Sequence, residues 1–361
     1  MKYFVRIAMI LLLCFQLQFA ICQNIAIVEG GNHHTNVFHT KALKKHPVIK
    51  WKFPTTGNAY GPPLVHKGVL YFGDEGGLLH AVNIKEGKEK WHYKVEGKIW
   101  SSPTIKNSYA YVGSTDGVMS CVSIQTGTIV WKYKTGIEAS CLPPTLKNDK
   151  VYFGSHDKNF YVLNSVTGNL EKKIDYDVPV CGSPSLDDSC IYISDFGGNV
   201  HALSIINYTE RWSFKAQKLI DQTPVIDNEN VYIPSYDKFI YCIEKDNGVL
   251  KWKQNINSVV THIGVADSLI FFNTMDGSLI AMKKTNGERI WEFKTEGKTY
   301  SRAILAENII YFGSGDGNIY AIDLLSGKEI WKFPVGSSVH RMTINNGIIF
   351  FGSGNFVFAI E

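Results

Sequence analysis

Hydrophobic and polar residues alternate in short runs that repeat along most of this chain. One representative stretch contains "SSPTI" (101–105), "AYVGS" (110–114), "VMSCVSI" (118–124) and "IVWKY" (129–133). Aromatic and β-branched residues occupy the middle of each run, as is typical of β-strands. The pattern therefore predicts units of four short strands.

The four-strand unit recurs about every forty residues. Tryptophans stand at 51, 91, 131, 212, 252, 291 and 331, with Lys172 in the gap, and successive spacings are 39 to 41 residues. An aromatic residue of a "YFG"-like strand precedes most of them, at positions 71, 111, 152, 192, 232, 271 and 311, and an eighth stands at 350. Repeats of this length and strand content are typical of β-propeller blades.

The turns support the same architecture. Asp-Gly pairs such as Asp316-Gly317 fall between the second and third strands, where both central residues tolerate positive φ in a tight hairpin. We therefore interpret Asp316, within "GSGDG", as a turn residue and not as part of a metal or phosphate site. Prolines precede the "YFG" aromatic by eight residues in five units, which favours an inner edge strand beside the central channel. The repeated tryptophan then lies on the outer strand and packs between blades.

The repeat count predicts how the ring closes. The eighth unit ends at Glu361 without its outer strand, whereas "VIKWKF" (48–53) precedes the first complete unit. We expect this spare strand to complete the last blade and remove the open edge. The predicted fold is an all-β, eight-bladed β-propeller with four-stranded blades, whose last blade is closed by an N-terminal strand.

The recurring "YFGSGDGNIYAIDLLSGKEIW" resembles the repeat of the pyrroloquinoline quinone (PQQ)-like β-propeller superfamily over essentially all of 48–361. In blade number the chain is most similar to eight-bladed envelope proteins, such as the lipoprotein of the outer-membrane β-barrel assembly machinery. The superfamily also includes quinoprotein dehydrogenases and sensors, so the fold alone does not decide the function.

The resemblance implies two alternatives. Quinoprotein alcohol dehydrogenases of the superfamily hold PQQ against a tryptophan and a disulfide between adjacent cysteines, with Ca²⁺ and a catalytic aspartate. This chain has no adjacent cysteines, and its short units lack long insertions. We therefore expect a non-catalytic binding or scaffolding protein of the cell envelope without a cofactor, with a role in outer-membrane protein assembly as the finer expectation. The alternative is a small quinoprotein dehydrogenase, or another enzyme that uses the channel mouth.

The N-terminus predicts export. Lys2 and Arg6 flank an apolar run, and Ala20 and Cys22 fit a cleavage before Gln23. The predicted organisation is a signal peptide (1–22), a polar lead-in (23–47) and the propeller (48–361). Ile21 is bulky where lipid-attachment sites prefer small residues, which argues against a lipid anchor at Cys22. We expect a periplasmic, envelope-associated or extracellular protein without a transmembrane segment after cleavage.

The net charge limits the classes of partner that the chain is expected to bind. Removing the two basic residues of the signal lowers the net charge from +4 to +2, which does not favour nucleic acid. A protein partner in the envelope is the main expectation.

Five cysteines remain after removal of the signal (Cys121, Cys141, Cys181, Cys190 and Cys242), so a disulfide framework is not favoured. The histidines of the lead-in (His33, His34, His39 and His46) would suit copper or zinc, but a mobile or draped segment is the preferred interpretation.

Candidate site residues are those that break the repeat at the start of the inner strands. Trp100 is the only tryptophan outside the outer-strand register, and Tyr60 and Tyr300 occupy the matching position in other units. These three aromatic residues predict a funnel that could stack on a ligand or on a partner. The alternative is that they plug the channel or pack on loops.

A second irregularity predicts a basic arc at the same mouth. The last three units lose the inner proline and carry His262, Arg302 and Arg341 in front of that position, with His340 beside the last. Such an arc suits a carboxylate, a phosphate or an acidic peptide, so a small anionic ligand is a further expectation. The alternative is that these side chains pair with nearby acids such as Asp221.

Overall fold

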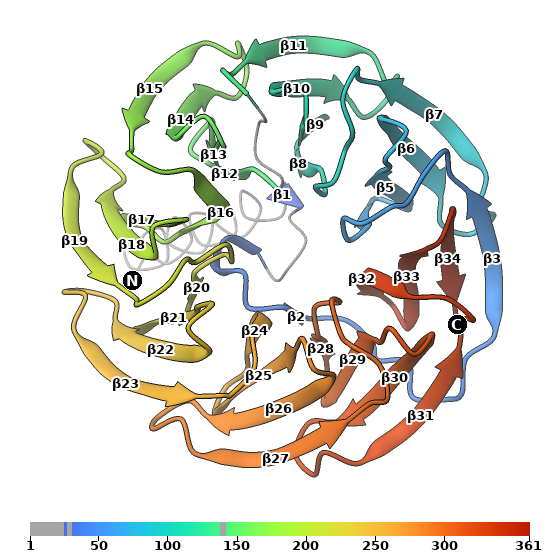
Figure 1. Cartoon of the computed structure of the whole chain (residues 1–361). Coiled ribbons are helices and arrows are strands. Elements are labelled where there is room, and N and C mark those ends of the chain that lie inside the picture. Colours follow the sequence, from blue (N-terminus) through green and yellow to red (C-terminus); the bar gives the residue numbers. More distant parts are fainter. Residues whose placement is uncertain (1–24, 27–30, 138–141) are drawn as a thin grey trace, which may run out of the picture.

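The computed structural model describes residues 25–26, 31–137 and 142–361 as eight β-sheets arranged around a central channel (Figure 1). The predicted signal peptide 1–22 and Cys141 lie outside these residues. No helix in the described part of the chain has the length and apolar character needed to cross a bilayer.

The first four blades follow the predicted order. Their strands, from the channel outward, are β4 (Leu64–His66), β5 (Val69–Gly73), β6 (Leu78–Asn83) and β7 (Glu89–Lys94) in blade 1; β8 (Thr104–Lys106), β9 (Tyr109–Gly113), β10 (Val118–Ser123) and β11 (Ile129–Lys134) in blade 2; β12 (Thr145–Lys147), β13 (Lys150–Gly154), β14 (Asn159–Asn164) and β15 (Leu170–Asp175) in blade 3; and β16 (Val180–Leu186), β17 (Cys190–Asp195), β18 (Asn199–Ser204) and β19 (Glu210–Lys215) in blade 4.

The remaining blades complete the ring. Their strands are β20 (Val225–Ile226), β21 (Asn230–Pro234), β22 (Phe239–Glu244) and β23 (Leu250–Asn255) in blade 5; β24 (Val260–Val265), β25 (Leu269–Thr274), β26 (Ser278–Lys283) and β27 (Arg289–Lys294) in blade 6; β28 (Ile304–Ala306), β29 (Ile309–Gly313), β30 (Asn318–Asp323) and β31 (Glu329–Pro334) in blade 7; and β32 (Val339–Asn345), β33 (Ile348–Ser353), β34 (Phe356–Ile360) and β3 (Ile49–Pro54) in blade 8.

The predicted closure is confirmed. Strand β3 pairs antiparallel with β34, with Ile49 opposite Ile360 and Pro54 opposite Phe356. The two strands lie side by side although they come from opposite ends of the chain (Figure 1). The outer edge of the last sheet is thus formed by the start of the propeller sequence, and no blade is left incomplete.

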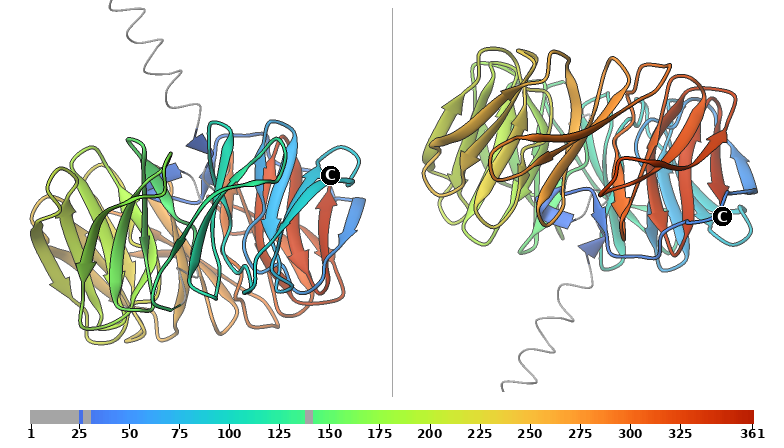
Figure 2. Two further views of the ribbon diagram at one scale, coloured as in Figure 1. Left: turned by 90° about the horizontal axis from the view of Figure 1, so that it is seen from above. Right: turned by 90° about the horizontal axis from the view of Figure 1, so that it is seen from below.

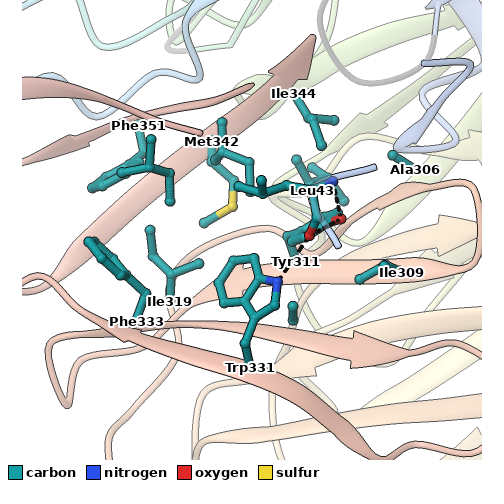
Figure 3. Packing of buried hydrophobic residues seen from close by; sticks show 14 of the residues in the cluster. Leu43, Ala306, Ile309, Tyr311, Ile319, Trp331, Phe333, Met342, Ile344 and Phe351 are labelled. Atoms are coloured by element: carbon teal, nitrogen blue, oxygen red, sulfur yellow. Dashed lines mark hydrogen bonds between the residues drawn. The ribbon is translucent and has the colours of Figure 1, made fainter. Parts of the chain in front are cut away.

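The predicted position of the tryptophans between blades is also confirmed. The Nε1 of Trp331 donates a hydrogen bond of 2.9 Å to the carbonyl oxygen of Leu43, and the ring packs among side chains of blades 7 and 8 (Figure 3). The hydroxyl of Tyr311 bonds the same carbonyl at 3.1 Å. Equivalent bonds run from Trp91 to Ile124 and from the other outer-strand tryptophans to the following blade. These apolar seams form the core.

The turn between the second and third strands differs from the expected two-residue hairpin. Gly317 has φ near 84°, but Asp316 does not have positive φ. The amide of Ser314 bonds the carbonyl of Asn318, so three residues form the connection and only the last needs a left-handed conformation. The Asp316 carboxylate accepts bonds from the Asn318 amide and from the Tyr320 hydroxyl, at 3.1 and 2.7 Å. The aspartate is a turn residue, as predicted.

The polar lead-in crosses one end of the channel. The 3-10 helix η1 (Gly31–His33) is followed by β2 (Val37–Phe38), which pairs parallel with the inner strand β28. The short strand β1 (Ile25–Ala26) pairs antiparallel with β8 on another side of the ring. Figure 2 shows β1 and β2 at the same end of the disc. We call this end the lead-in face and the opposite end the mouth face.

Candidate functional site

The lead-in fills the channel on the side of blades 3, 4, 6 and 7. The Nε2 of His34 lies 3.2 Å from the carbonyl oxygen of Pro184, and the Asn36 amide donates to the carbonyl of Ile263 at 3.2 Å. In return, the amides of Val265 and Leu305 donate to the carbonyls of residues 35 and 36. His34 and Asn36 are buried. The lead-in histidines are therefore part of a draped segment, in agreement with the preferred interpretation.

These histidines do not gather around a common point. Burial lowers the pKa of His34 to about 4, and His46 packs against the ring of Phe333. Within the described ranges, no three His, Cys, Asp or Glu side chains are placed to hold a metal ion.

The mouth face opens into a cavity of about 660 Å³. Its walls come from the connections between blades, from the turns between second and third strands and from the ends of the inner strands β16 and β32. The lining residues are Tyr60, Glu75, Trp100, Leu142, His156, Val180, Gly182, Phe196, Asp221, Gln222, Tyr300, Ser338, His340 and Arg341. The structure thus brings five of the seven predicted site residues to one cavity.

The predicted aromatic funnel is present in this cavity. Tyr60 and Tyr300 are 37% and 58% exposed, and Trp100, which lines the same cavity, is partly buried. The ring of Tyr60 meets the ring of His340 edge to face, with centroids 4.6 Å apart. The Nζ of Lys98 lies 5.6 Å from the centroid of the Trp100 ring. These side chains leave much of their aromatic surface facing the opening.

The basic arc is largely absent from the mouth. His262 and Arg302 are buried, at 1% and 3% exposure, and neither lines the mouth cavity. Arg302 lies beside Asn36 and Phe38 of the lead-in, in a crevice that it shares with Arg341. Burial, together with Arg341, lowers the pKa of Arg302 well below its usual range. The lead-in covers this level of the channel, which the repeat alone did not reveal.

Local irregularities in three inner strands shape the cavity. The register of β32 shifts between Val339 and Met342, so His340 and Arg341 fall in a bulge at the mouth. Similar shifts occur in β16 and β24. A β-bulge re-aims side chains without interrupting the sheet, and bulges are common beside functional sites. The bulge in β32 therefore places His340 and Arg341 in the cavity wall.

Several lining residues were not predicted. Glu75, His156 and Phe196 occupy equivalent places in the turns of blades 1, 3 and 4, and Leu142 and Asp221 lie in connections between blades. If the turns between second and third strands had been aligned across the blades, as the inner strands were, His156 and Phe196 would have stood out as departures from the repeat. The convergence of turns and connections on one cavity is a three-dimensional property.

The cavity carries charges of both signs. The Asp221 carboxylate accepts bonds of 2.8 Å from the Tyr236 hydroxyl and from the Gln222 amide. Asn58 and Lys98 donate to Glu75 and lower the pKa of that carboxyl. Because Asp221 and Glu75 share the wall with Arg341, a purely anionic ligand is not favoured.

His340 adds little positive charge. Burial and the neighbouring Arg341 lower the pKa of its imidazole, against a smaller opposing effect of Glu75. The ring is therefore uncharged at neutral pH.

The cysteines described with their side chains belong to the core. Cys121, Cys190 and Cys242 are free and buried. Cys121 lies opposite Trp131 and Cys242 lies opposite Trp252, positions that alanine takes in most other blades. Burial raises the pKa of both thiols to about 12. These two cysteines act as small core residues next to a tryptophan.

Comparison with known proteins gives one family match. Residues 48–175 and 197–361 match the PQQ-repeat family described as outer membrane protein assembly factor BamB. No curated protein is significantly similar in sequence. Among solved structures, BamB from Moraxella catarrhalis has 18% identity and a TM-score of 0.76, over 88% of this chain and all of that one.

Two other similar structures show how widely the fold is shared. A europium-containing methanol dehydrogenase has 12% identity and a TM-score of 0.79, over 92% of this chain and 97% of that chain. The computationally designed protein Ika8 has 18% identity and a TM-score of 0.76, over 85% of this chain and 98% of that chain. At these identities the likeness concerns the fold.

Proposed function

Because the chain belongs to the PQQ-repeat family of the outer membrane protein assembly factor BamB, we propose that it is a non-catalytic binding protein of the cell envelope that acts as a scaffold in outer-membrane protein assembly. The N-terminal signal predicted for residues 1–22 supports export. The lack of a helix able to span a membrane, among the residues described, is compatible with a protein held at the envelope by its partners.

The observation that carries the proposal is the exposed aromatic rim of the mouth face. Tyr60, Phe196 and Tyr300 are exposed by 37%, 37% and 58% around one opening. Aromatic side chains with a polar tip dominate the energetics of many protein interfaces, because they bury a large area at a small entropic cost. The opposite end of the channel is crossed by the lead-in, so this rim is the more accessible of the two for a partner.

Site-specific photocrosslinking tests this proposal. A photoreactive amino acid at position 300 should form an adduct with one component of an envelope extract. The same amino acid at position 206, which is 83% exposed in a turn on the lead-in face, serves as the matched control. Excess unlabelled protein should compete for the adduct, whereas the double variant Tyr60→Ala/Tyr300→Ala should not. Equal labelling at positions 206 and 300 would argue against a partner at the mouth.

The dehydrogenase alternative receives no support from the donor groups. A quinoprotein site needs Ca²⁺ ligands beside the quinone, and no suitable cluster of acidic, histidine or cysteine side chains is found in the part of the chain that the structure describes. The sequence also has no adjacent cysteines. After incubation with PQQ and Ca²⁺, we expect neither quinone absorbance in the purified protein nor reduction of an electron-acceptor dye.

A further inference from the structure

The mouth cavity has the dimensions of a small-ligand site. Its volume of about 660 Å³ falls within the range of roughly 300–1,000 Å³ that is typical of such sites. The buried His34 and Asn36 of the lead-in cross the channel below it. A ligand must therefore enter and leave through the mouth face, as a free small molecule or as the end of a longer chain.

We propose that this cavity binds a neutral saccharide. The inference goes beyond scaffolding and shares with the proposed function only the requirement that the mouth is open. The ligand would be a short oligosaccharide or the terminal sugars of an envelope polymer, since both offer the same pyranose rings.

The aromatic side chains supply flat apolar surfaces. Tyr60, Trp100 and Tyr300 come from three separate connections between blades and line the same cavity. The face of an aromatic ring carries partial negative charge and attracts the weakly positive C–H groups of a pyranose ring. A sugar can stack on such rings and still direct its hydroxyl groups to the remaining wall.

The remaining wall offers fixed polar groups. Asp221 is held by Tyr236 and Gln222 and keeps acceptor capacity for hydroxyl groups, since a carboxylate has about four acceptor sites. The Nε1 of Trp100 and the Oε1 of Gln222 are buried, and neither finds a hydrogen-bond partner within the described residues. Neither atom is exposed to the cavity, so each side chain would have to move slightly before it could bond a ligand.

The balance of charge favours a neutral ligand. The carboxylates of Glu75 and Asp221 oppose the binding of an anion, and the guanidinium of Arg341 opposes a cation. Glu75 is also paired with Lys98 at 3.0 Å, and His340 is uncharged at neutral pH. Carboxylates accept hydrogen bonds and a guanidinium donates them, so together they suit hydroxyl groups, which both donate and accept hydrogen bonds.

An extended peptide strand fits the cavity less well. Tyr60, Trp100, Asp221 and Tyr300 all lie outside strands, so most of the wall consists of side chains on connections. Recognition of extended peptides commonly uses the free hydrogen-bonding edge of a sheet. Saccharides are recognised through side chains, which is what this mouth presents.

Titration of the purified protein with sugars tests the proposal without any envelope component. The probes are maltotriose, cellotriose and triacetylchitotriose, with sialyllactose as an anionic comparison. Binding is measured by isothermal titration calorimetry and by ligand-observed NMR. We expect at least one neutral trisaccharide to bind with a Kd of about 1 mM or tighter, the usual range for weak small-ligand binding. Trp100→Ala and Asp221→Asn should each weaken binding about tenfold, equivalent to about 1.4 kcal/mol. Ile206→Ala on the lead-in face should leave it unchanged.

The possible results separate this inference from the scaffolding role. Thermal melting of Trp100→Ala confirms that the variant is folded. The saccharide proposal is overturned if no neutral probe binds at about 10 mM, a concentration that would half-saturate even a 10 mM site. Tighter binding of sialyllactose, or affinity unchanged in Trp100→Ala, would also overturn it. A partner adduct at position 300 without sugar binding would retain the scaffold and reject the saccharide. Co-sedimentation of the protein with insoluble cellulose, chitin or starch would indicate that it binds the terminal sugars of a polymer. Binding of the soluble trisaccharides alone would indicate a free oligosaccharide as the ligand.

Discussion

At the scale of single residues, each blade seam depends on a tryptophan and on the small residues next to it. A Cβ added at Gly127 would lie 2.7 Å from the Trp91 ring, and the equivalent glycines of five other turns meet a tryptophan in the same way, except that the first contact at Gly287 is with Gln254. Each of these glycines also has positive φ. Glycine is therefore required both by the close approach of the indole and by the backbone conformation.

Blade 3 shows that these residues vary together. Lys172 replaces the tryptophan and lies opposite Val162, where other blades have alanine or cysteine. The next turn carries Tyr208 in place of glycine, with φ near 62°. The Tyr208 side chain packs in this seam, and its hydroxyl accepts a bond of 2.7 Å from Lys150. Once the indole is absent, the glycine is no longer needed and a tyrosine occupies the space.

We predict that Trp331→Ala destabilises the fold by about 3–5 kcal/mol, since a large buried side chain leaves a cavity when it is truncated. Trp331 is 5% exposed and bonds Leu43. Urea denaturation measures the change in the free energy of unfolding. Ile330→Ala is the control, because residue 330 is 41% exposed and should change stability by less than about 0.5 kcal/mol. Equal effects of the two substitutions would contradict the packing role of the indole.

The turn aspartates use two arrangements. In blades 3, 5 and 7, a third-strand tyrosine donates to an aspartate four residues before it, as Tyr320 does to Asp316. In blades 1 and 4, the aspartate moves two places towards the N-terminus and a histidine replaces the tyrosine. His201 lies 3.2 Å from Asp195 and 2.6 Å from Glu210, and His80 is placed in the same way in blade 1. The position of the acid and the type of its partner change together.

This arrangement predicts a pH dependence. Burial alone would lower the pKa of His201, but hydrogen bonds to Asp195 and Glu210 raise it above its ordinary value of 6.5. A group with a raised folded-state pKa stabilises the fold fully below its unfolded-state pKa, and the stabilisation is lost as the pH rises through the folded-state value. We expect the contribution of His201 to the free energy of unfolding to fall as the pH increases above 6.5.

Denaturant titration of His201→Gln checks this effect. Glutamine retains a hydrogen-bond donor but cannot be protonated, so the difference in stability between the wild-type protein and the variant should be largest below pH 6.5 and should shrink at higher pH. A difference that stays constant from pH 5.5 to 8.5 would show that the histidine stabilises the turn without a charge.

At the scale of elements, the inner strands differ most from one blade to the next. Those preceded by proline, such as β8 (Thr104–Lys106), are short and begin directly after the proline. Strands β24 and β32 lack the proline and extend towards the mouth with a register shift. An edge strand accepts proline because its unpaired N–H is not needed. Proline is not the only determinant, because β16 (Val180–Leu186) contains Pro184 and still pairs near the mouth with a register shift, whereas β28 (Ile304–Ala306) follows Ala303 and is short. In β32 the bulge places His340 and Arg341 in the cavity wall.

Closure by β3 leads to a second stability prediction. Deletion of residues 47–54 removes the outer strand of blade 8 and exposes the edge of β34, so both melting temperature and cooperativity should fall. Deletion of the last dozen residues should have a similar or larger effect because it removes β34 itself. Thermal unfolding followed by circular dichroism measures both variants. A melting curve identical to that of the full chain would contradict closure by this strand.

The repeated elements could be predicted from the sequence because eight copies provide the same pattern. The four strands of each blade, the position of Trp331 between blades and the spare strand at 48–53 follow from the register of the repeat. The crossing of the channel by His34 and Asn36 could not be predicted, since the lead-in occurs once and has no period. For the same reason, the repeat located Arg302 just before the inner strand of its blade but did not show the segment that buries it.

At the scale of the whole molecule, the ring has two unlike ends. The lead-in covers one end, where β2 adds to the inner edge of blade 7 (Figure 1). The other end opens into a cavity walled by turns and connections from all around the ring. Since loops tolerate variation while the blades fix their positions, binding specificity can change at the mouth without altering the seams. The lead-in face thus contributes to structure, and the mouth face is available for recognition.

The pairing of Ile49 with Ile360 has a consequence for synthesis on the ribosome. Strand β3 emerges among the first segments of the propeller, yet its neighbour β34 is translated last. Blades 1 to 7 contain all their strands in sequence order, so each can form while the nascent chain is still growing. The early strand must wait, unpaired and open to misassociation, until β34 has been made. Ring closure therefore requires that all eight blades have been translated, and a chain truncated before β34 keeps an exposed edge.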